Sequence, residues 1–104
     1  MERIAFKMKL LPGCAEEYKK RHDKIWPHLV ILLKETGISD YSIFLDEETN
    51  ILFGVLKADK VSEIDKLPQN LIMQEWWEYM DDIMETNADS SPVSTLLKDV
   101  FYLP

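Results

Sequence analysis

The sequence predicts an α+β domain with the element order β-α-β-β-α-β around one antiparallel sheet. Three patterns lead to this prediction. Apolar and polar residues alternate over residues 2–11, which is typical of a strand with one buried face. A short polar turn joins two strand-like runs at residues 41–46 and 51–58, which indicates a hairpin. Apolar residues recur at helical spacing over residues 14–26 and again over residues 73–84.

Proline and the short apolar runs define the remaining elements. Trp26 precedes Pro27, which disfavours helical geometry at Trp26, so we expect a break there and a second short helix over residues 27–33. Residues 94–97 are ambiguous, and a last strand is expected over residues 100–103. Such a chain forms the split βαβ, or ferredoxin-like, arrangement, with both helices on one face of the sheet.

Both faces of the predicted hairpin carry large apolar side chains. Ile43 is followed by Phe44, and Leu52 by Phe53, and successive residues of a strand point to opposite faces. The predicted helices cover only one face, so the other face needs a cover that the chain does not supply. A second copy packed sheet against sheet is the simplest cover, and we therefore expect a homodimer.

Length, composition and charge restrict the class of protein and its partners. Residues 1–104 are enough for one domain, and with 46% hydrophobic and 30% charged residues they can form an ordinary packed core. A net charge of −7 repels phosphate groups, so neither nucleic acid nor a membrane is expected as a partner. The chain does not begin like a signal peptide and has no membrane-spanning run, so we expect a cytoplasmic protein.

Motifs for metal, nucleotide and phosphate chemistry are missing from the sequence. It contains no HExxH pattern and no phosphate-binding glycine loop. Cys14 is the only cysteine, so neither an intrachain disulfide nor a cysteine metal cluster can form. We therefore expect no metal and no cofactor. A reaction that runs on side chains alone favours proton transfer over redox or phosphoryl transfer.

His22 is the sharpest candidate for such a reaction, because it stands on the apolar stripe of a predicted helix. Histidine titrates near neutral pH and can act as a general acid or base. A partly buried histidine whose ring nitrogens are satisfied by neighbours is the more common case. Tyr18 lies one turn earlier on the same stripe, where it could fix a ring nitrogen or bind a ligand hydroxyl.

Trp76 and Trp77 are adjacent in the later helix, and both fit its buried face. Core packing is the more common role for such residues. Each indole N–H nevertheless needs a partner when buried, and indole faces suit the C–H face of a sugar whose hydroxyls form hydrogen bonds. Tyr41, in the second strand, is either a residue at the rim of the core or a further hydroxyl contact. With Tyr18 and His22, these residues could form one sugar-binding pocket.

The motifs around these residues resemble the L-rhamnose mutarotase family. The likeness covers the whole chain, and the motifs are highly specific in combination. His28 and Ala88 differ from the family's usual glutamate and proline, but neither is a candidate site position. The matching motifs are RHxxIWP at 21–27, WWxYM at 76–80, SPVS at 91–94 and VFYLP at 100–104.

The resemblance implies a dimeric α/β barrel, in which two ferredoxin-like units join through their sheets. It implies an isomerase that interconverts the α and β anomers of L-rhamnose, without a cofactor, in the cytoplasm, in rhamnose catabolism. It also implies that His22 is the catalytic acid. The sugar contacts that it implies are Tyr18, Tyr41, Trp76 and Trp77.

Mutarotation opens the pyranose ring and closes it again on the other face of C1. Our hypothesis is that His22, as imidazolium, protonates the ring oxygen O5, while an unassigned base takes the proton of the O1 hydroxyl. An apolar contact would select the methyl group of a 6-deoxy sugar, with Met8, Ile25 and Trp26 as candidates. Two alternatives stay open: a cofactor-free monooxygenase on the same fold, and a non-enzymatic, dimeric ligand-binding module.

Overall fold

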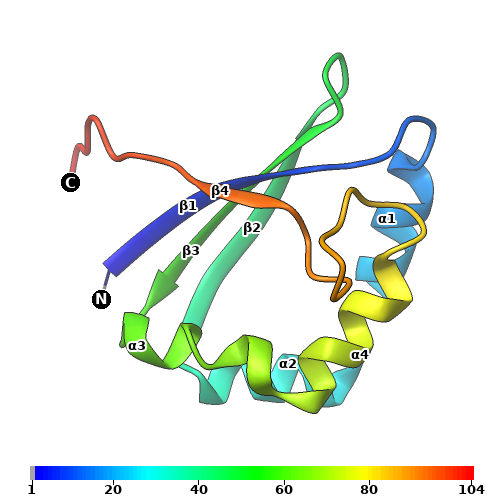
Figure 1. Cartoon of the computed structure of the whole chain (residues 1–104). Helices are drawn as coiled ribbons and strands as arrows, with labels where there is room; N and C mark the ends of the chain where they lie inside the picture. Colours follow the sequence, from blue (N-terminus) through cyan, green and yellow to red (C-terminus); the bar gives the residue numbers. More distant parts are fainter. Residues whose placement is uncertain (1) are drawn as a thin grey trace.

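The computed structural model describes residues 2–104, which form a four-stranded antiparallel sheet with helices on one side (Figure 1). The strand order is β2-β3-β1-β4, so the two strands of each β-α-β unit are separated by a strand of the other unit. This order is that of the ferredoxin-like arrangement, and it confirms the predicted α+β class. The strands are β1 (Glu2–Lys9), β2 (Ile38–Asp46), β3 (Ile51–Ala58) and β4 (Ser94–Leu96).

The helices lie in the two connections between strands that are not hairpin neighbours (Figure 1). Two helices connect β1 to β2, and α4 with two short helical turns connects β3 to β4. No helix within residues 2–104 is both long enough and apolar enough to cross a membrane. The helices are α1 (Ala15–Asp23), α2 (Pro27–Glu35), α3 (Val61–Ile64), the 3-10 turn Leu67–Gln69 and α4 (Leu71–Met80).

The predicted break before Pro27 is confirmed. Helix α1 ends at Asp23, three residues before the predicted end at Trp26. Trp26 has an extended backbone (φ −61°, ψ 130°), and Pro27 occupies the first turn of α2, where its missing N–H has no cost. The chain therefore changes direction between the two helices.

The last predicted strand is wrong. The strand is β4, Ser94–Leu96, and it pairs with β1 so that Met8 faces Ser94 and Phe6 faces Leu96. In this antiparallel register the paired residue numbers add up to 102, so residue 100 would face Glu2 and the residues after it would have no partner on β1. The predicted strand 100–103 is instead an exposed tail, with Val100 87% exposed.

The last long helix is shorter than its apolar pattern. Helix α4 ends at Met80, four residues before the predicted end at Met84. Ile83 and Met84 are buried all the same, because the chain turns and Met84 forms a bridge with Leu10 after β1. The apolar residues at helical spacing therefore extend past the end of the helix into a non-helical turn, where they are still buried.

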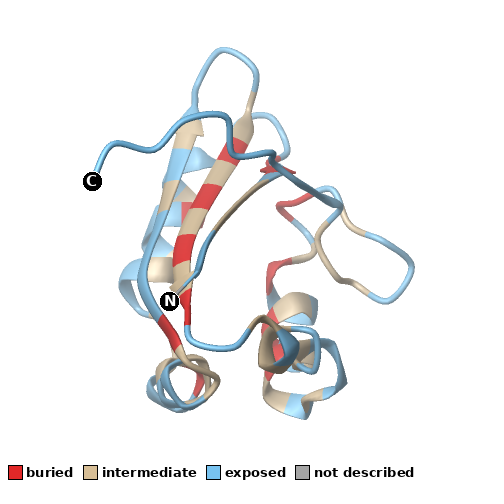
Figure 2. Ribbon diagram, turned by 90° about the vertical axis from the view of Figure 1, so that its left-hand side faces the viewer, coloured by how far each residue is buried: buried red, intermediate tan, exposed pale blue. Residues whose placement is uncertain are grey.

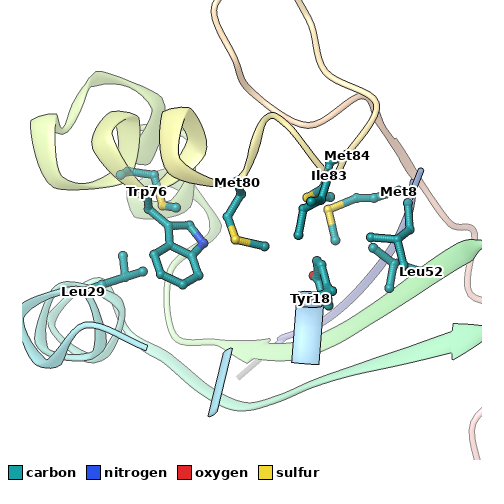
Figure 3. Close-up of a cluster of buried hydrophobic side chains, with 10 residues drawn as sticks. Met8, Tyr18, Leu29, Leu52, Trp76, Met80, Ile83 and Met84 are labelled. Carbon is teal, nitrogen blue, oxygen red and sulfur yellow. The ribbon is translucent and has the colours of Figure 1, made fainter. Parts of the chain in front are cut away.

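The core lies between the sheet and the helices. Buried and partly buried residues alternate along β3, as the banding of that strand in Figure 2 shows. The buried side chains of the strands meet those of the helices and of the turn after α4 (Figure 3). The central members of this cluster are Met8, Leu10, Tyr18, Leu29, Leu52, Met73, Trp76, Met80, Ile83 and Met84.

Candidate active site

A cavity of about 1440 Å³ lies between the helix-facing side of the sheet and the helices. The sequence placed its candidate residues on two helices and a strand that are far apart in the chain, without deciding whether they meet. The structure brings all of them to the wall of this cavity: Tyr18, His22, Tyr41, Trp76 and Trp77. Much of the remaining wall is apolar and comes from β1, β2 and β3.

His22 is held through one ring nitrogen. Its Nδ1 lies 3.0 Å from the main-chain oxygen of Tyr18, one turn earlier in α1. A carbonyl oxygen only accepts hydrogen bonds, so Nδ1 carries the proton in this contact. The other nitrogen, Nε2, has no protein partner among the described residues and is not completely buried, and His22 lines the cavity. It therefore offers a lone pair to a ligand when the ring is neutral.

Aromatic rings surround the His22 imidazole. The Tyr18 ring stacks on it with centroids 4.3 Å apart, and the Trp76 ring meets it edge-on at 5.4 Å. Burial among these rings lowers the pKa of His22, and this effect exceeds the opposing effects of the Tyr18 carbonyl and of Asp23. The neutral imidazole is thus the resting form at neutral pH.

Two phenol groups face the same space. Burial raises the pKa of Tyr18, with a further contribution from nearby Tyr41. Tyr41 retains 39% of its accessible surface, but it lines the cavity, and burial raises its pKa to about 12. Both phenols therefore keep their protons at neutral pH and can donate or accept hydrogen bonds.

A bulge and a close packing contact set the position of Tyr41. The pairing of β2 with β3 shifts between Ser39 and Ser42, just around Tyr41, and such irregularities re-aim side chains. The Phe6 ring then meets the Tyr41 ring edge-on, with centroids 6.2 Å apart. Phe6 can occupy this place because it lies over Gly54, where a Cβ would clash with the ring.

The two tryptophans differ in their surroundings. Trp76 is only 6% exposed and belongs to both the core and the cavity wall, and its ring nitrogen faces the middle of the cluster in Figure 3. Trp77 is partly buried and also lines the cavity. Neither indole N–H forms a hydrogen bond within the described chain, and neither nitrogen atom is completely buried. Both can still serve a ligand.

The third tryptophan is not part of the cavity wall. Trp26 stacks on the exposed His28 and meets Trp76 edge-on at 5.0 Å. Of the three residues considered for an apolar methyl contact, Met8 and Ile25 line the cavity and Trp26 does not. Trp26 therefore packs against Trp76 without lining the cavity itself.

Arg21 is a residue that sequence reasoning passed over. Its side chain is only 12% exposed, and its guanidinium binds the carboxylates of Glu17 and Asp82 at 2.8 Å. A signal existed, because Glu17 stands four residues before Arg21, as in a helical ion pair. The contact with Asp82 joins residues 61 positions apart in the sequence, and no local sequence pattern predicts it.

Metal ligands are not gathered in this part of the chain. Residues 2–104 contain no group of three or more histidine, cysteine, aspartate or glutamate side chains that could hold a metal ion. Cys14 is a free thiol whose nearest polar contact is the carbonyl oxygen of Pro12, at 3.7 Å.

Comparison with known proteins identifies this arrangement. The family model described as rhaM, L-rhamnose mutarotase, matches residues 3–103. The chain belongs to the L-rhamnose mutarotase family. An L-rhamnose mutarotase of Sinorhizobium fredii is 61% identical over 103 residues, which cover 99% of each chain. The crystal structure of an L-rhamnose mutarotase from Formosa agariphila has a TM-score of 0.94 at 51% identity, with both chains covered completely.

Membership of the L-rhamnose mutarotase family confirms the resemblance of the sequence motifs and the predicted isomerase class. It also weighs against the two alternatives. A crystal structure of an antibiotic biosynthesis monooxygenase is similar with a TM-score of 0.52, but only 11% of the residues are identical. That likeness shows a shared fold and nothing about the reaction.

Proposed function

We propose that this protein interconverts the α and β anomers of L-rhamnose, and that His22 is its acid-base residue. The observation that carries this proposal is the single free nitrogen of His22. Its Nδ1 is bound to the Tyr18 carbonyl, so Nε2 alone is available to the cavity. A sugar bound there would meet one group that titrates near neutral pH, together with neutral phenols and indole N–H groups.

The lowered pKa of His22 changes the order of proton transfers. The sequence hypothesis began with an imidazolium that protonates O5. A resting neutral imidazole begins instead by accepting the O1 proton on Nε2. The same imidazolium then donates that proton to O5 as the C1–O5 bond breaks and C1=O1 forms. Because O1 and O5 are both attached to C1, one nitrogen can serve both atoms. No second base is then required.

Reclosure reverses these transfers. Rotation about C1–C2 presents the other face of the aldehyde to the O5 hydroxyl. Imidazole takes the O5 proton as the C1–O5 bond forms and returns it to O1. A placed acid or base contributes roughly 10²–10⁴ in rate, which is a suitable size for a reaction that already proceeds slowly in water.

The remaining site residues have binding roles in this proposal. Tyr18 and Tyr41 hold sugar hydroxyls as neutral phenols, in keeping with their raised pKa values. Trp76 and Trp77 pack on the C–H face of the sugar and exclude water. The methyl group of L-rhamnose contacts an apolar part of the wall such as Met8 or Ile25. Such a contact discriminates by about 1–3 kcal/mol.

The direct test is anomer exchange followed by NMR magnetization transfer. Purified protein should accelerate exchange between the two anomers of L-rhamnose. It should act least on D-glucose, because L-fucose shares the 6-methyl group of L-rhamnose and D-glucose does not. Equal acceleration of all three sugars would contradict the proposed methyl contact. No acceleration of L-rhamnose exchange would contradict the proposed function itself, and oxygen uptake with an aromatic substrate would then favour the monooxygenase alternative.

We also propose that the protein is a homodimer joined through the outer face of its sheet. Phe44 is 63% exposed and is paired across the strands with Phe53. Both side chains point away from the helix side, because their neighbours Ile43 and Leu52 pack in the core cluster. An exposed apolar patch of this kind is typical of an interface.

The remaining parts of the proposal concern the setting of the reaction. We propose that residues 1–104 act as one domain, in the cytoplasm, in rhamnose catabolism, without a cofactor. The net charge of −7 suits a neutral sugar and disfavours nucleic acid as a partner.

A further inference from the structure

We infer that Arg21 is a positioning residue that holds helix α1 in a fixed relation to helix α4. Helix α1 carries Tyr18 and His22, and α4 carries Trp76 and Trp77. The relative placement of the two helices therefore sets where the acid-base nitrogen stands over a sugar held by the indoles. This inference rests on the proposed function of the cavity.

The guanidinium of Arg21 reaches three groups in fixed directions. Its Nη1 donates to the carbonyl oxygen of Tyr79 at 2.8 Å and to Oδ1 of Asp82 at 2.8 Å. Its Nη2 donates to Oδ2 of Asp82 at 3.2 Å, which completes a two-pronged pair. Its Nε donates to Glu17, one turn earlier in α1, at 2.8 Å. The planar guanidinium is thus bound by Glu17 within α1, and by Tyr79 and Asp82 at the end of α4.

The partner groups are those that the end of a helix leaves free. Tyr79 lies in the last turn of α4, where main-chain carbonyl groups have no partner within the helix and the helix dipole favours a cation. The Arg21 guanidinium also lies 4.7 Å from the centre of the Tyr79 ring. Arg21 therefore binds the end of α4 through a carbonyl, an aromatic face and the following Asp82.

Within residues 2–104, no other side chain of α1 forms a hydrogen bond to α4 or to the turn after it. Among the described residues, every side-chain hydrogen bond from α1 to another element comes from Arg21. The remaining ones stay within α1, such as Lys19 with Asp23 and His22 with Tyr18. Ring contacts between His22 and Trp76 fix a separation, but they have less directional preference than a forked ion pair.

Arg21 acts through other residues, because it does not line the cavity. It precedes His22 directly and so points to a different side of the helix. Loosening its contacts would let α1 shift against α4 and admit water around the imidazole. A displacement of about 1 Å can reduce a rate by up to about 10²-fold.

The test uses Arg21→Lys, which keeps the positive charge but cannot form the two-pronged pair. Arg3→Lys is a matched control, because Arg3 is the only other arginine and also stacks on a tyrosine ring, that of Tyr102, at 3.6 Å. Asp82→Asn is a second variant that weakens the same link from the α4 side. Each protein is studied well below its thermal midpoint, so that all of it is folded.

Two readouts separate positioning from stability. We expect kcat for L-rhamnose anomer exchange to fall by about 10- to 100-fold in Arg21→Lys and in Asp82→Asn, with a smaller change in KM. We expect the pKa of His22, followed by NMR titration of its ring, to rise toward the ordinary histidine value in both variants. Arg3→Lys should leave both readouts at their wild-type values. The His28→Ala variant assigns the two ring signals.

A lowered thermal midpoint with unchanged kcat and unchanged His22 pKa in both variants would overturn the inference and leave Arg21 a purely stabilising residue. The pKa readout does not need activity. If the wild-type protein failed to accelerate anomer exchange, the proposed function would fail, while the titration would still show whether Arg21 sets the surroundings of His22.

Discussion

Nδ1 of His22 lies 3.0 Å from the main-chain oxygen of Tyr18, and this contact determines which nitrogen can react. A helix supplies the carbonyl at the right distance one turn earlier, so the orientation of the ring is coupled to the helix itself. The proton on Nδ1 leaves Nε2 as the acceptor in the neutral ring. The same residue pair also stacks ring on ring at 4.3 Å, which buries the imidazole and favours its neutral form.

Replacing His22 by alanine should remove the acid-base group and leave the fold intact. We expect the catalysed part of anomer exchange to fall by roughly 10²–10⁴, with an unchanged circular dichroism spectrum. The control is His28→Ala, since His28 is exposed and stacks on Trp26 outside the cavity. Full exchange in His22→Ala would remove His22 from the mechanism.

The pH dependence of the reaction should follow the neutral form of His22. Burial lowers the pKa of His22, so kcat/KM should be constant at neutral pH and should fall only below the ordinary histidine value of about 6.5. The same sign holds for stability: the free energy of unfolding is highest above that value and decreases as the pH falls toward the lower pKa of the folded state. A rate that increased on acidification through this range would instead support an imidazolium as the starting form.

Tyr41→Phe should weaken sugar binding without destabilising the protein, because the Tyr41 hydroxyl has no partner in the described chain. Loss of one hydrogen bond of about 0.5–1.5 kcal/mol corresponds to a rise in KM of roughly 2- to 10-fold. Steady-state exchange kinetics measure this change. Tyr102→Phe, in the exposed tail, is the control. An unchanged KM in Tyr41→Phe would exclude its hydroxyl as a sugar contact.

Gly54→Ala should disturb the site through Phe6. The new Cβ would clash with the Phe6 ring, which packs on Tyr41. We expect a loss of about 1–3 kcal/mol in the free energy of unfolding, as for other overpacked cores, measured by urea denaturation. Adding Phe6→Leu should recover part of that loss by making room. If the double variant were no more stable than Gly54→Ala, the contact with Phe6 would not be the cause.

Phe44→Lys should convert the proposed dimer into a monomer, because it places a charge on the outer face of the sheet. Sedimentation velocity should show a twofold lower mass for this variant than for the wild type. Ile31→Lys is a suitable control, since Ile31 is a similarly exposed apolar residue (55%) on helix α2. A wild-type protein that sediments as a monomer would refute the proposed dimer.

Local sequence signals predicted most of the elements of the fold but not all of their ends. Period-two alternation located β1 and most of β2, and Pro27 located the break between α1 and α2. The prediction of the last strand was wrong because strand propensity does not determine which residues of two strands pair. With Phe6 opposite Leu96, residue 100 would face Glu2, the first residue of β1, and residues 101–103 would have no partner on that strand. The apolar pattern after Met80 likewise reports burial, and a turn can bury side chains as well as a helix.

The sequence by itself determined the fold class, the family through its motifs, and the five candidate residues of the site. Only the tertiary structure decided that these residues share one cavity, that Nε2 is the free nitrogen of His22, and that Arg21 binds the end of α4. The physical reason is the separation along the sequence over which each kind of interaction acts. Periodicity and turn chemistry depend on neighbours a few residues apart, whereas the Arg21–Asp82 pair and the burial that lowers the pKa of His22 depend on segments that meet only after the chain has folded.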